Sequence, residues 1–295
     1  MARVVVTGGA GKLGRAVVTD LVRHGWDVVV FDRVRPAGLP YDVAAAVTVV
    51  PMDLTDYGAV LDAMHGLDEH YGTGRGSSVD ALVHLAAIPA PAVVGDHATF
   101  ANNMNTTFNV FTAARRVGVR NVVWASSETV LGLPFDTPPP YLPVDEEYAP
   151  RPTTTYSLTK TLEETLAAQL CAWDPELTMV GLRFSNVMEP QDYAQFPSFD
   201  ADPRLRKWNL WGYIDARDGA QAVRLGLERD TPGMEICVIA AADTVMSRPN
   251  AELVAEVFPD VEVRRDLGEH DTLLSIDKAR RVLGYAPEHS WRSEV

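Results

Sequence analysis

The sequence contains few cysteines and lysines, and it has no excess of positive charge. Its 295 residues include two cysteines, Cys171 and Cys237, in apolar surroundings without a second cysteine or a histidine at metal-ligand spacing. We therefore expect buried free thiols, no disulfide framework and no metal site. With 26 Lys and Arg against 40 Asp and Glu, the net charge is −14. Such a surface repels phosphate groups, which argues against binding to nucleic acids or anionic membranes.

Long apolar runs are lacking as well. No stretch approaches the roughly 18 apolar residues of a membrane-spanning helix, and the first residues lead straight into a strand-like segment without a leader pattern. We therefore expect a cytoplasmic protein. Hydrophobic residues still make up 46% of the chain, which is enough for a core and too much for disorder. At roughly 150 residues per domain, the length fits two domains or one large domain with an appendage.

Short β-branched runs alternate with helical patterns through the first two thirds of the chain. Strands are expected at Arg3–Thr7, Asp27–Phe31, Val47–Met52, Ala81–Leu85, Asn121–Ser126 and Thr178–Phe184. Helices are expected at Lys12–His24, Tyr57–His65, Thr99–Val117 and Thr155–Ala172. The near-continuous Val and Leu content is typical of strands that are buried on both faces of a parallel sheet. The pattern predicts an α/β fold with a Rossmann-type doubly wound parallel sheet.

The alternation breaks down after residue 188. An irregular, aromatic stretch is followed by expected helices near Arg217–Glu228, Pro249–Val257 and Ser275–Leu283, and by a strand near Glu235–Ile239. We expect a dinucleotide-binding domain at 1–188 and a small C-terminal α/β substrate lobe at 189–295. Loops are predicted at Gly72–Ser78, which is rich in Gly and Ser, and at Pro134–Pro152, which holds seven prolines.

A glycine-rich turn follows the first expected strand. The segment Thr7–Gly14 reads Thr-Gly-Gly-Ala-Gly-Lys-Leu-Gly and opens the first helix. Gly8 permits a tight turn, Gly11 lets the backbone approach a pyrophosphate, and Gly14 lets the helix pack closely on the sheet. The helix N-terminus adds free N–H groups and the positive end of a dipole. We expect a dinucleotide to contact Gly8, Gly11, Lys12, Leu13 and Gly14, although an ordinary glycine-rich turn shares the pattern.

An acidic residue ends the second expected strand. Asp32 can accept hydrogen bonds from both hydroxyls of an adenosine ribose and would repel a 2′-phosphate, which favours NAD over NADP. Arg33 directly after it points the other way, because a guanidinium can hold that phosphate. After the third strand, Asp53 and Leu54 are candidates to contact the adenine; alternatively, Asp53 caps the next helix.

The segment Tyr156–Lys160 carries the chemistry. Residues four apart share one face of a helix, so the Tyr156 hydroxyl and the Lys160 ammonium can reach one cleft. A nearby cation stabilises a phenolate and lowers the pKa of a tyrosine from about 10. Tyr156 can then exchange a proton with a substrate hydroxyl while a hydride leaves the same carbon. An exposed Tyr-Lys pair is common by chance, but here it accompanies the glycine turn and Ser126-Ser127 at a strand end.

Taken together, these motifs resemble the extended short-chain dehydrogenase/reductases, the NAD-dependent sugar epimerase/dehydratase family, over nearly the whole chain. The matching segments are Thr7–Gly14, Asp32, Asp53-Leu54, His84–Ala87, Asn103–Val110, Ser126–Gly132, Tyr156–Lys160, Arg183–Val187 and Asp277–Tyr285. The resemblance implies that Tyr156 is the acid/base, that Lys160 lowers its pKa and holds the nicotinamide ribose, and that Ser127 contacts the reacting hydroxyl.

The resemblance also suggests further contacts. It implies that Leu85, Ala86, Ala87 and Asn103 lie at the cofactor, and that Asn186 touches the substrate, although either asparagine also fits a role in satisfying local backbone. Glu128 and Arg206 are further candidates to bind substrate. His84 fits a packed strand end better than a catalyst. The family also implies a homodimer, formed through the helices expected at Thr99–Val117 and Thr155–Ala172.

Departures from the family pattern narrow the activity. The 4,6-dehydratases of the family have Thr-Asp-Glu where this chain has Ser127-Glu128-Thr129, and the Thr129 hydroxyl is no base at neutral pH, which argues against dehydration. Nucleotide-sugar 4-epimerases usually have Tyr at the position of Leu131 and a longer segment than Met188–Tyr213, to wrap a nucleotide diphosphate. Cationic groups bind the oxygens of such a diphosphate, and the basic residues in and just after this segment are few: Arg204, Arg206, Lys207 and Arg217.

Local similarity to uronate dehydrogenases points to a free sugar. It lies in Ser127–Gly132 and Arg206–Asp215, and those enzymes oxidise a sugar acid at its anomeric carbon. Arg183 or Arg206 would then pair with a substrate carboxylate, or Arg206 is a solvated surface charge. The aromatic residues Trp208, Trp211 and Tyr213 either stack on a sugar or pack the lobe.

Three hypotheses follow from these motifs. We favour an NAD-dependent dehydrogenase that acts at a secondary alcohol or hemiacetal carbon of a sugar or sugar acid. The alternative is a nucleotide-sugar 4-epimerase, similar to UDP-glucose 4-epimerase, which would use the same Tyr156 and Lys160. The third is a non-catalytic NAD-sensing protein, against which the intact Ser127, Tyr156 and Lys160 argue.

Overall fold

The computed structural model describes residues 1–70, 79–135 and 137–294. The loop predicted at Gly72–Ser78 lies outside these residues. None of the described helices is both long and apolar enough to cross a bilayer.

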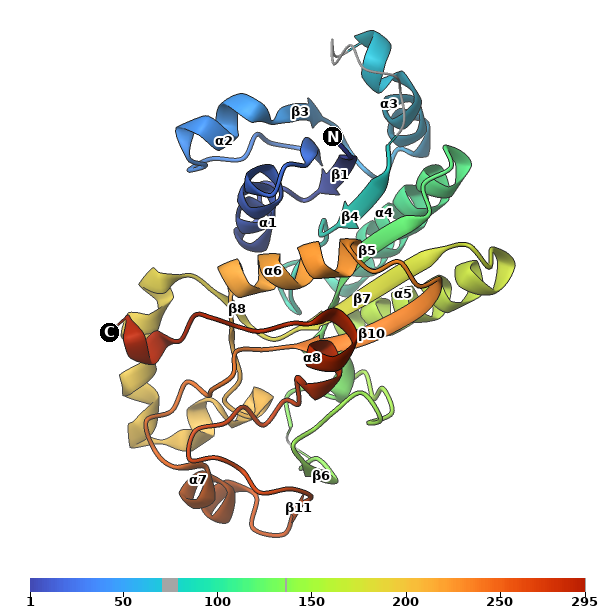
Figure 1. The fold of residues 1–295 in the computed structure, drawn as a ribbon. Helices are drawn as coiled ribbons and strands as arrows, with labels where there is room; N and C mark the ends of the chain where they lie inside the picture. The colour runs from blue at the N-terminus through green and yellow to red at the C-terminus, as the bar shows by residue number, and fades with distance from the viewer. Residues whose placement is uncertain (71–78, 136, 295) are drawn as a thin grey trace.

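A seven-stranded parallel sheet forms the centre of the molecule (Figure 1). Its strands are β1 (Arg3–Thr7), β2 (Asp27–Asp32), β3 (Thr48–Pro51), β4 (Ala81–His84), β5 (Asn121–Ser127), β7 (Thr178–Phe184) and β10 (Gly233–Ile239). Their order is β10-β7-β5-β4-β1-β2-β3, so the chain winds outward in opposite directions from β1. The two directions part between β1 and β4, and open α/β sheets bind ligands at such a point, beyond the carboxyl ends of the strands. The predicted doubly wound parallel sheet is confirmed.

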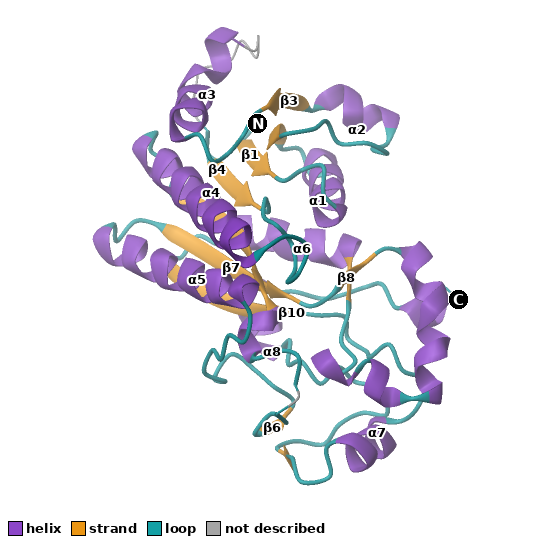
Figure 2. Cartoon of the chain, turned by 180° about the vertical axis from the view of Figure 1, so that it is seen from behind, coloured by secondary structure: helices purple, strands orange, loops and turns teal. Residues whose placement is uncertain are grey.

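Helices cover both faces of the sheet, as Figures 1 and 2 show from opposite sides. One face carries α1 (Lys12–Arg23), α2 (Tyr41–Ala46) and α6 (Ala216–Leu227), with α1 packed directly on α6. The other carries α3 (Tyr57–His70), α4 (Asp96–Arg116) and α5 (Thr155–Trp173) in a row. Each face buries its own apolar cluster, to which alternate residues of the strands contribute: Val4 and Val6 face one cluster, and Val5 faces the other.

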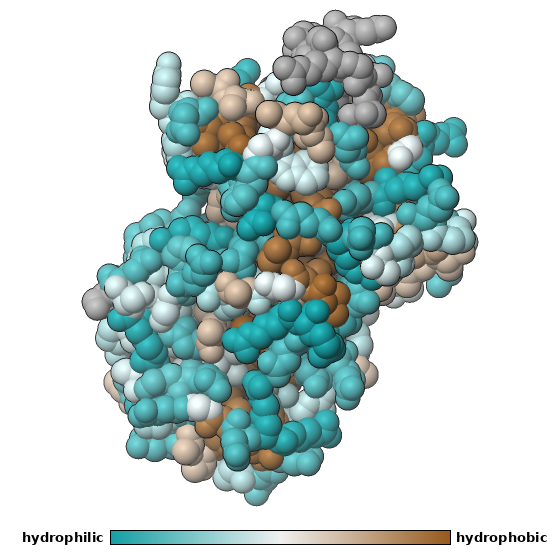
Figure 3. Space-filling model, in the orientation of Figure 1, coloured by the Kyte–Doolittle hydropathy of each residue, from teal (hydrophilic) through white to brown (hydrophobic). Residues whose placement is uncertain are grey.

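The remaining segments gather beyond β7 and β10, in the lower part of Figure 1. They contain β6 (Tyr141–Leu142), which pairs with β11 (Glu262–Val263), β8 (Val187–Met188), which pairs with β9 (Ile214–Asp215), and the helices α7 (Asn250–Val257) and α8 (Asp277–Leu283). Short 3-10 helices complete them: η1 (Glu128–Leu131), η2 (Pro190–Ala201), η3 (Pro203–Leu205), η4 (Lys207–Asn209) and η5 (Trp291–Ser293). The surface in Figure 3 is mostly hydrophilic, with its largest apolar area near the centre of the view and smaller apolar patches above and below it.

The architecture places residues 216–239 with the sheet. The expected division at 188/189 assigned them to the lobe, but α6 packs on α1, and β10 pairs with β7 along the edge of the sheet. The structure also contains α2, which the sequence did not indicate, because Val43 is its only fully buried residue and no apolar stripe marks it. Cys237 is a buried free thiol, as expected, whereas Cys171 is only half-buried at the end of α5.

Candidate active site

A cavity of about 790 Å³ lies at the carboxyl ends of the strands, where the two winding directions part. It collects residues from the loops after β1, β2, β3, β4, β5 and β7 and from α5. Its lining includes these predicted site residues: Gly8, Gly11, Lys12, Leu13, Gly14, Asp32, Asp53, Leu54, Leu85, Ala86, Ala87, Ser127, Glu128, Tyr156, Lys160 and Asn186. Two predicted residues, Asn103 and Arg206, are not among the described lining residues.

The glycine turn between β1 and α1 has the close geometry that the sequence predicted. Gly8 has a φ of +74°, and a Cβ built on it would lie 2.6 Å from the backbone nitrogen of Ala86. A Cβ on Gly14 would collide with the carbonyl oxygen of Gly8. Only glycine fits both positions, because no side chain has room at either and, at Gly8, the positive φ strains other residues. The turn thereby brings bare backbone and the N-terminus of α1 to the cavity wall.

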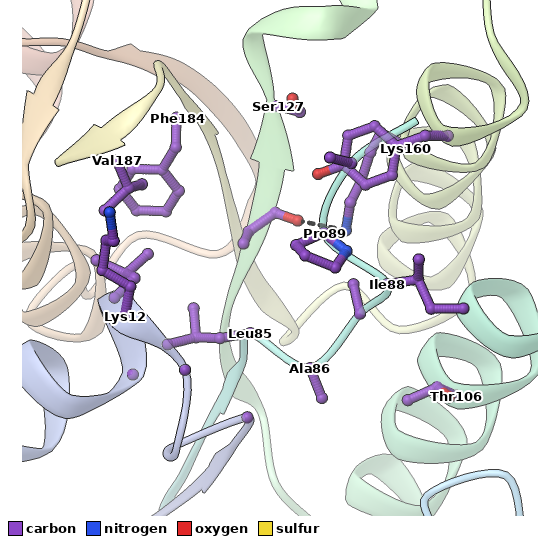
Figure 4. Close-up of a pocket in the computed structure, with 18 of the residues that line it drawn as sticks. Lys12, Leu85, Ala86, Ile88, Pro89, Thr106, Ser127, Lys160, Phe184 and Val187 are labelled. Carbon is purple, nitrogen blue, oxygen red and sulfur yellow. Dashed lines mark hydrogen bonds between the residues drawn. The ribbon is translucent and has the colours of Figure 1, made fainter. Parts of the chain in front are cut away.

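Two ion pairs connect the start of α1 to the lobe. The Lys12 ammonium lies 2.5 Å from a carboxylate oxygen of Asp192, and the Arg15 guanidinium lies 2.9 Å from Glu189. In Figure 4, Lys12 stands on the opposite side of the cavity from Lys160, and the segment from Leu85 to Pro89 runs between them. Lys12 therefore faces the cavity with one acidic partner already beside it.

The end of β2 carries the acidic residue expected at an adenosine ribose. The carboxylate of Asp32 accepts hydrogen bonds from the backbone N–H of Ala10, at 3.0 Å, and of Val34, at 3.3 Å. Arg33, by contrast, donates from one nitrogen to both carboxylate oxygens of Asp53, at 3.1 Å each. A hydrogen bond from the Thr55 backbone, together with the Thr55 hydroxyl and Arg33, lowers the pKa of Asp53 to about 2.

Asp53 does not cap the following helix. The N–H of Ala59 in the first turn of α3 is instead accepted by Asp56, at 3.0 Å. Asp53 accepts from Thr55, which tightens the turn after β3 and leaves the residue in the cavity wall.

Asn103 lies behind the cavity wall. Its side-chain oxygen accepts from the backbone N–H of Ile88 at 2.8 Å, and its amide donates to the Ile88 carbonyl at 3.1 Å. Asn103 therefore fixes the loop after β4 by satisfying both backbone groups of one residue, which was the alternative left open for it. Its neighbours on α4, Asn102 and Thr106, line the cavity.

The N-terminus of α5 brings Tyr156 and Lys160 to the cavity. Thr154 caps this helix, because its hydroxyl accepts from the N–H of Ser157 at 3.1 Å while the Ser157 hydroxyl accepts from the N–H of Thr154 at 2.9 Å. Two residues into the helix, Tyr156 and Lys160 share a face, and the Lys160 ammonium lies 5.9 Å from the centre of the Tyr156 ring. Ser127, at the end of β5, lines the same cavity.

Burial dominates the electrostatics of Tyr156. It raises the pKa of the Tyr156 hydroxyl above its ordinary value, and Glu163 acts in the same direction, while Lys160 and a hydrogen bond with Ser127 act in the opposite one. The sequence predicted that Lys160 would bring this pKa toward neutrality. Lys160 does lower the pKa of Tyr156, but removal of the phenolate from water raises that pKa by more than the ammonium lowers it.

Glu163 is the residue of the site that the sequence reasoning missed. The Lys160 ammonium donates to Glu163 at 2.9 Å and to the carbonyl oxygen of Ala125 at 2.8 Å. Both side chains are buried, with 3% of Lys160 and none of Glu163 exposed. The signal was present in the sequence, since Glu163 follows Lys160 by three residues and residues at that spacing meet on a helix.

The polar residues behind Glu163 form a buried chain. The ring of His84 lies between the hydroxyls of Thr7, at 2.7 Å, and Thr107, at 3.1 Å. Burial and the positive charge of Lys160 lower the pKa of His84 to about 3, so its ring is neutral. His84 is therefore a packed residue at a strand end, as expected.

A second buried ion pair, between β7 and α5, lies beside β5. Arg183 on β7 donates two hydrogen bonds to Glu164, at 2.9 and 2.8 Å, and the Ser126 hydroxyl donates to the same carboxylate at 2.6 Å. Arg183 was a candidate to pair with a substrate carboxylate. In the structure, the Arg183 guanidinium pairs with the Glu164 carboxylate instead. Arg183 is also not among the described residues that line the cavity.

The other end of the cavity contains Glu128, Asn186 and Trp208. Arg206 lies behind Trp208, where its guanidinium stacks 4.8 Å from the indole and donates to the Gly212 carbonyl at 2.9 Å. Arg206 is buried, so it is neither a solvated surface charge nor a described part of the cavity wall. Trp211 and Tyr213 are fully buried in the lobe, which leaves Trp208 as the one of these three aromatic residues that lines the cavity.

Comparisons with known proteins identify the family of the chain. The model of the NAD dependent epimerase/dehydratase family matches residues 4–233, which include the glycine turn, Asp32, Ser127, Tyr156 and Lys160. The chain belongs to this family. The resemblance inferred from the sequence motifs is thereby confirmed.

Individual family members differ in activity. The chain is 28% identical over 218 residues to UDP-glucose 4-epimerase of Bacillus subtilis, a match that covers 72% of this chain and 59% of the epimerase. It thus spans less than two thirds of the length of that relative. It is 26% identical over 298 residues to the NAD-dependent glucose-6-phosphate dehydrogenase of Haloferax volcanii, with 97% and 92% of the two chains covered. A mutated uronate dehydrogenase has the same fold, with a TM-score of 0.65, 22% identity and coverage of 100% and 85%.

Proposed function

We propose that this protein is an NAD-dependent dehydrogenase that oxidises a secondary alcohol or hemiacetal carbon of a sugar or sugar acid. The observation that carries the proposal is the single cavity that joins the glycine turn and Asp32 to Ser127, Tyr156 and Lys160. Its size, about 790 Å³, suits a small-molecule site. The intact Ser127, Tyr156 and Lys160 argue against a protein that only senses NAD.

The cavity residues fit a dinucleotide. The close packing at Gly8 and Gly14 holds the turn against the sheet, a Cβ on Gly11 would meet only the Gly8 carbonyl oxygen at 3.3 Å, and the N-terminus of α1 favours the negative charge of a pyrophosphate. Asp32 suits a ribose with two free hydroxyls, and the Arg33 guanidinium is directed to Asp53, which together favour NAD over NADP. When bound, NAD⁺ supplies the hydride acceptor.

The chemistry of the chain itself is a proton transfer. Ser127 orients the substrate hydroxyl, and Tyr156 takes the proton of that hydroxyl as the carbon loses its hydride, which leaves a carbonyl product. Tyr156 is a phenolate before it takes this proton, and the Lys160 ammonium lowers the energy of that phenolate. The hydrogen bond from Lys160 to the Ala125 carbonyl holds the ammonium in place. We further propose that Glu128 and Asn186 contact the substrate, because both line the cavity near Ser127.

The charges near the substrate end favour a free sugar over a nucleotide sugar. The described cationic residues of the wall are Lys12, Arg33 and Lys160, all in the cofactor and catalytic half. Three arginines close in sequence to Trp208 have other partners: Arg204 pairs with Glu256, Arg206 donates to the Gly212 carbonyl behind the wall, and Arg217 pairs with Asp215. A nucleotide diphosphate would find few cations here.

A nucleotide-sugar 4-epimerase is the second candidate, and the match to the Bacillus epimerase supports it. An epimerase returns the hydride to the opposite face of the same carbon, so it retains its cofactor, whereas a dehydrogenase exchanges its cofactor in every turnover.

One experiment separates the two candidates. The purified protein is denatured, released NAD is quantified by absorbance and mass, and untreated protein is assayed for NADH at 340 nm with NAD and a panel of aldoses and uronates. A dehydrogenase releases little NAD and forms NADH with at least one sugar. Retention of about one NAD per chain, with interconversion of UDP-glucose and UDP-galactose and no NADH, would refute our proposal.

We also propose a cytoplasmic homodimer. Phe100 and Phe108 on α4 and Leu158 on α5 are 39%, 52% and 41% exposed, and α4 packs beside α5, so these side chains offer an apolar surface to a second copy. Free thiols at Cys171 and Cys237 suit a reducing compartment. Light scattering coupled to size exclusion measures the mass, and Phe108→Glu would yield the monomer.

A further inference from the structure

Glu128 is a buried carboxylate in the wall of the cavity. It follows Ser127 directly, lines the same cavity as Tyr156, and has 3% of its surface exposed. The chemistry proposed above gives it no proton to move. Burial of a charged group is costly unless the group is paired or hydrogen-bonded. The partners of the Glu128 carboxylate therefore indicate which groups this position accommodates.

Side-chain donors from two different segments hold the carboxylate, and the backbone N–H of Asn186 adds a third hydrogen bond. The Ser185 hydroxyl, just after β7, donates to one oxygen of Glu128 at 2.6 Å. The side-chain amide of Asn209, at the end of η4, donates to the other oxygen at 3.1 Å. Each carboxylate oxygen accepts more than one hydrogen bond, so capacity for further donors remains.

The segment that carries Asn209 has an unusual backbone. Leu210 and Trp211 follow it with φ values of +56° and +57°, a region that bulky residues rarely enter. The segment is held there by its burial, by the Trp211 indole, which donates to the Pro203 carbonyl at 2.8 Å, and by a second bond from Asn209 to the Gly212 carbonyl at 2.9 Å. Backbone strain of this kind gathers at functional sites.

Charge is balanced only in part around Glu128. Arg206 is the cation whose field reaches it, but the guanidinium is directed to Gly212 and to Trp208, and the structure records no ion pair between Arg206 and Glu128 in the described part of the chain. Burial raises the pKa of Glu128 to about 7, against the hydrogen bonds from Ser185 and Asn209 and the charge of Arg206. The position is therefore an acceptor of hydrogen bonds above neutral pH.

We propose that Glu128 determines specificity by accepting hydrogen bonds from substrate hydroxyls near the reacting carbon, so that the substrate is a neutral sugar and not a sugar acid. An ionised carboxylate accepts and never donates, so it matches hydroxyl groups and repels a second carboxylate. This inference rests on the proposed dehydrogenase function and narrows its substrate class.

The test compares wild type, Glu128→Gln and a matched control. At pH 8.5, kcat/KM is measured through NADH for glucose and galactose and for glucuronate and galacturonate. Wild type should favour the neutral sugar by about tenfold or more, because like charges at close range oppose binding. In Glu128→Gln, the logarithm of the ratio of kcat/KM for the neutral sugar to kcat/KM for the uronate should fall to half of its wild-type value or less. The kcat/KM for the uronates should rise. Glu146→Gln removes a carboxylate that bonds the Val238 backbone outside the described cavity wall, and it should leave the ratio unchanged.

A pH series tests the same idea without a variant. Glu128 is protonated below its pKa of about 7, so the preference of wild type for the neutral sugar should fall between pH 8.5 and pH 6. The charged groups that face Glu128 are Arg206 and, when ionised, Tyr156. Titration of Tyr156 changes the rates with the neutral sugar and with the uronate alike, so it leaves the ratio of the two rates unchanged.

The outcomes keep this inference apart from the proposed function. Equal rates with both sugar classes, faster oxidation of glucose 6-phosphate than of glucose, or an unchanged ratio in a folded Glu128→Gln would overturn the role of Glu128 and leave the dehydrogenase in place. If Glu128→Gln does not fold, a ratio that is flat with pH in wild type has the same meaning. NADH from no sugar, with interconversion of UDP-sugars, would refute the proposed function and the inference with it.

Discussion

Removal of Glu163 should destabilise the protein through Lys160. The Lys160 ammonium has two partners, the Glu163 carboxylate and the Ala125 carbonyl, and it is almost completely buried. In Glu163→Ala, one neutral oxygen would be left as the hydrogen-bond partner of an ammonium whose side chain is only 3% exposed. Loss of one partner of a buried ion pair costs about 3–5 kcal/mol.

This loss of stability should produce a measurable fall in the melting temperature, Tm. At about 2.1 cal/mol/K per residue, unfolding of 295 residues gains an entropy of about 0.6 kcal/mol/K. A loss of about 3–5 kcal/mol therefore lowers Tm by about 5–8 °C. Glu163→Gln keeps an acceptor for the ammonium and loses the charge, so its Tm should fall by about half as much.

The pH dependence has a definite sign. Burial lowers the pKa of Lys160, but Glu163 and Tyr156 outweigh burial, and the folded-state pKa lies above its ordinary value. A raised pKa stabilises the fold below the unfolded value of about 10.4 and loses that effect as the pH rises through the folded value. Without Glu163, burial is opposed only by the weaker effects of Tyr156 and Glu164, so the pKa of Lys160 falls. The deficit of Glu163→Ala should therefore be complete at pH 7 and shrink toward pH 10.

The assay is thermal unfolding of protein without added cofactor, followed by far-UV circular dichroism from pH 6 to pH 10. The double variant Lys160→Met, Glu163→Leu replaces the pair with apolar side chains and should recover most of the loss. A Glu163→Ala protein that melts within about 1 °C of wild type at pH 7, where the expected change is several degrees, would refute the reasoning. So would a deficit that grows with pH.

Three further predictions concern the proposed reaction. Tyr156→Phe should remove most NADH formation and leave NAD binding, measured by calorimetry, within about threefold, because its hydroxyl moves a proton and its ring packs unchanged. Equal turnover would exclude Tyr156 as the acid/base. Asp32→Ala should raise kcat/KM with NADP relative to NAD, since a repelling carboxylate is lost; a constant ratio would contradict the ribose role. Asn103→Ala should raise the KM for NAD and leave kcat nearly unchanged, because the loop at Ile88 loses both of its bonds. Steady-state kinetics checks it, and a drop in kcat alone would place Asn103 in the chemistry.

The sequence predicted most of the sheet because most of its strands contain a run of apolar, mainly β-branched residues. Thr178–Phe184 is buried at every position, so its bounds follow from composition alone, and they coincide with β7. The helix α2 exposes Tyr41 and buries Val43 alone, so no periodic stripe announces it. The sequence analysis placed β10 in the C-terminal lobe for another reason. Its pairing with β7 joins segments more than fifty residues apart, and no local sequence pattern predicts such a partner.

The site shows the same limit at the level of single residues. Tyr156, Lys160 and the glycine turn were found because spacing along the chain fixes their geometry. The roles of Asn103 and Arg206 depend on what lies across from them, the Ile88 backbone in one case and Trp208 with Gly212 in the other. A polar residue in a family motif therefore predicts proximity to the site better than it predicts contact with a ligand.

The ion pairs at the start of α1 show how such distant contacts bear on the cofactor. Lys12 meets Asp192 across 180 positions of sequence, and its side chain is 39% exposed. An exposed pair of this kind contributes about 0–1 kcal/mol, so a pyrophosphate with two negative charges can compete with one carboxylate for the ammonium. The N–H groups of Gly8, Ala10 and Gly11 in the turn already donate within the protein, whereas the first N–H groups of a helix have no intrahelical partner. The first N–H groups of α1, and not the Lys12 ammonium, should therefore account for most of the phosphate affinity, while Lys12 links the turn to the lobe.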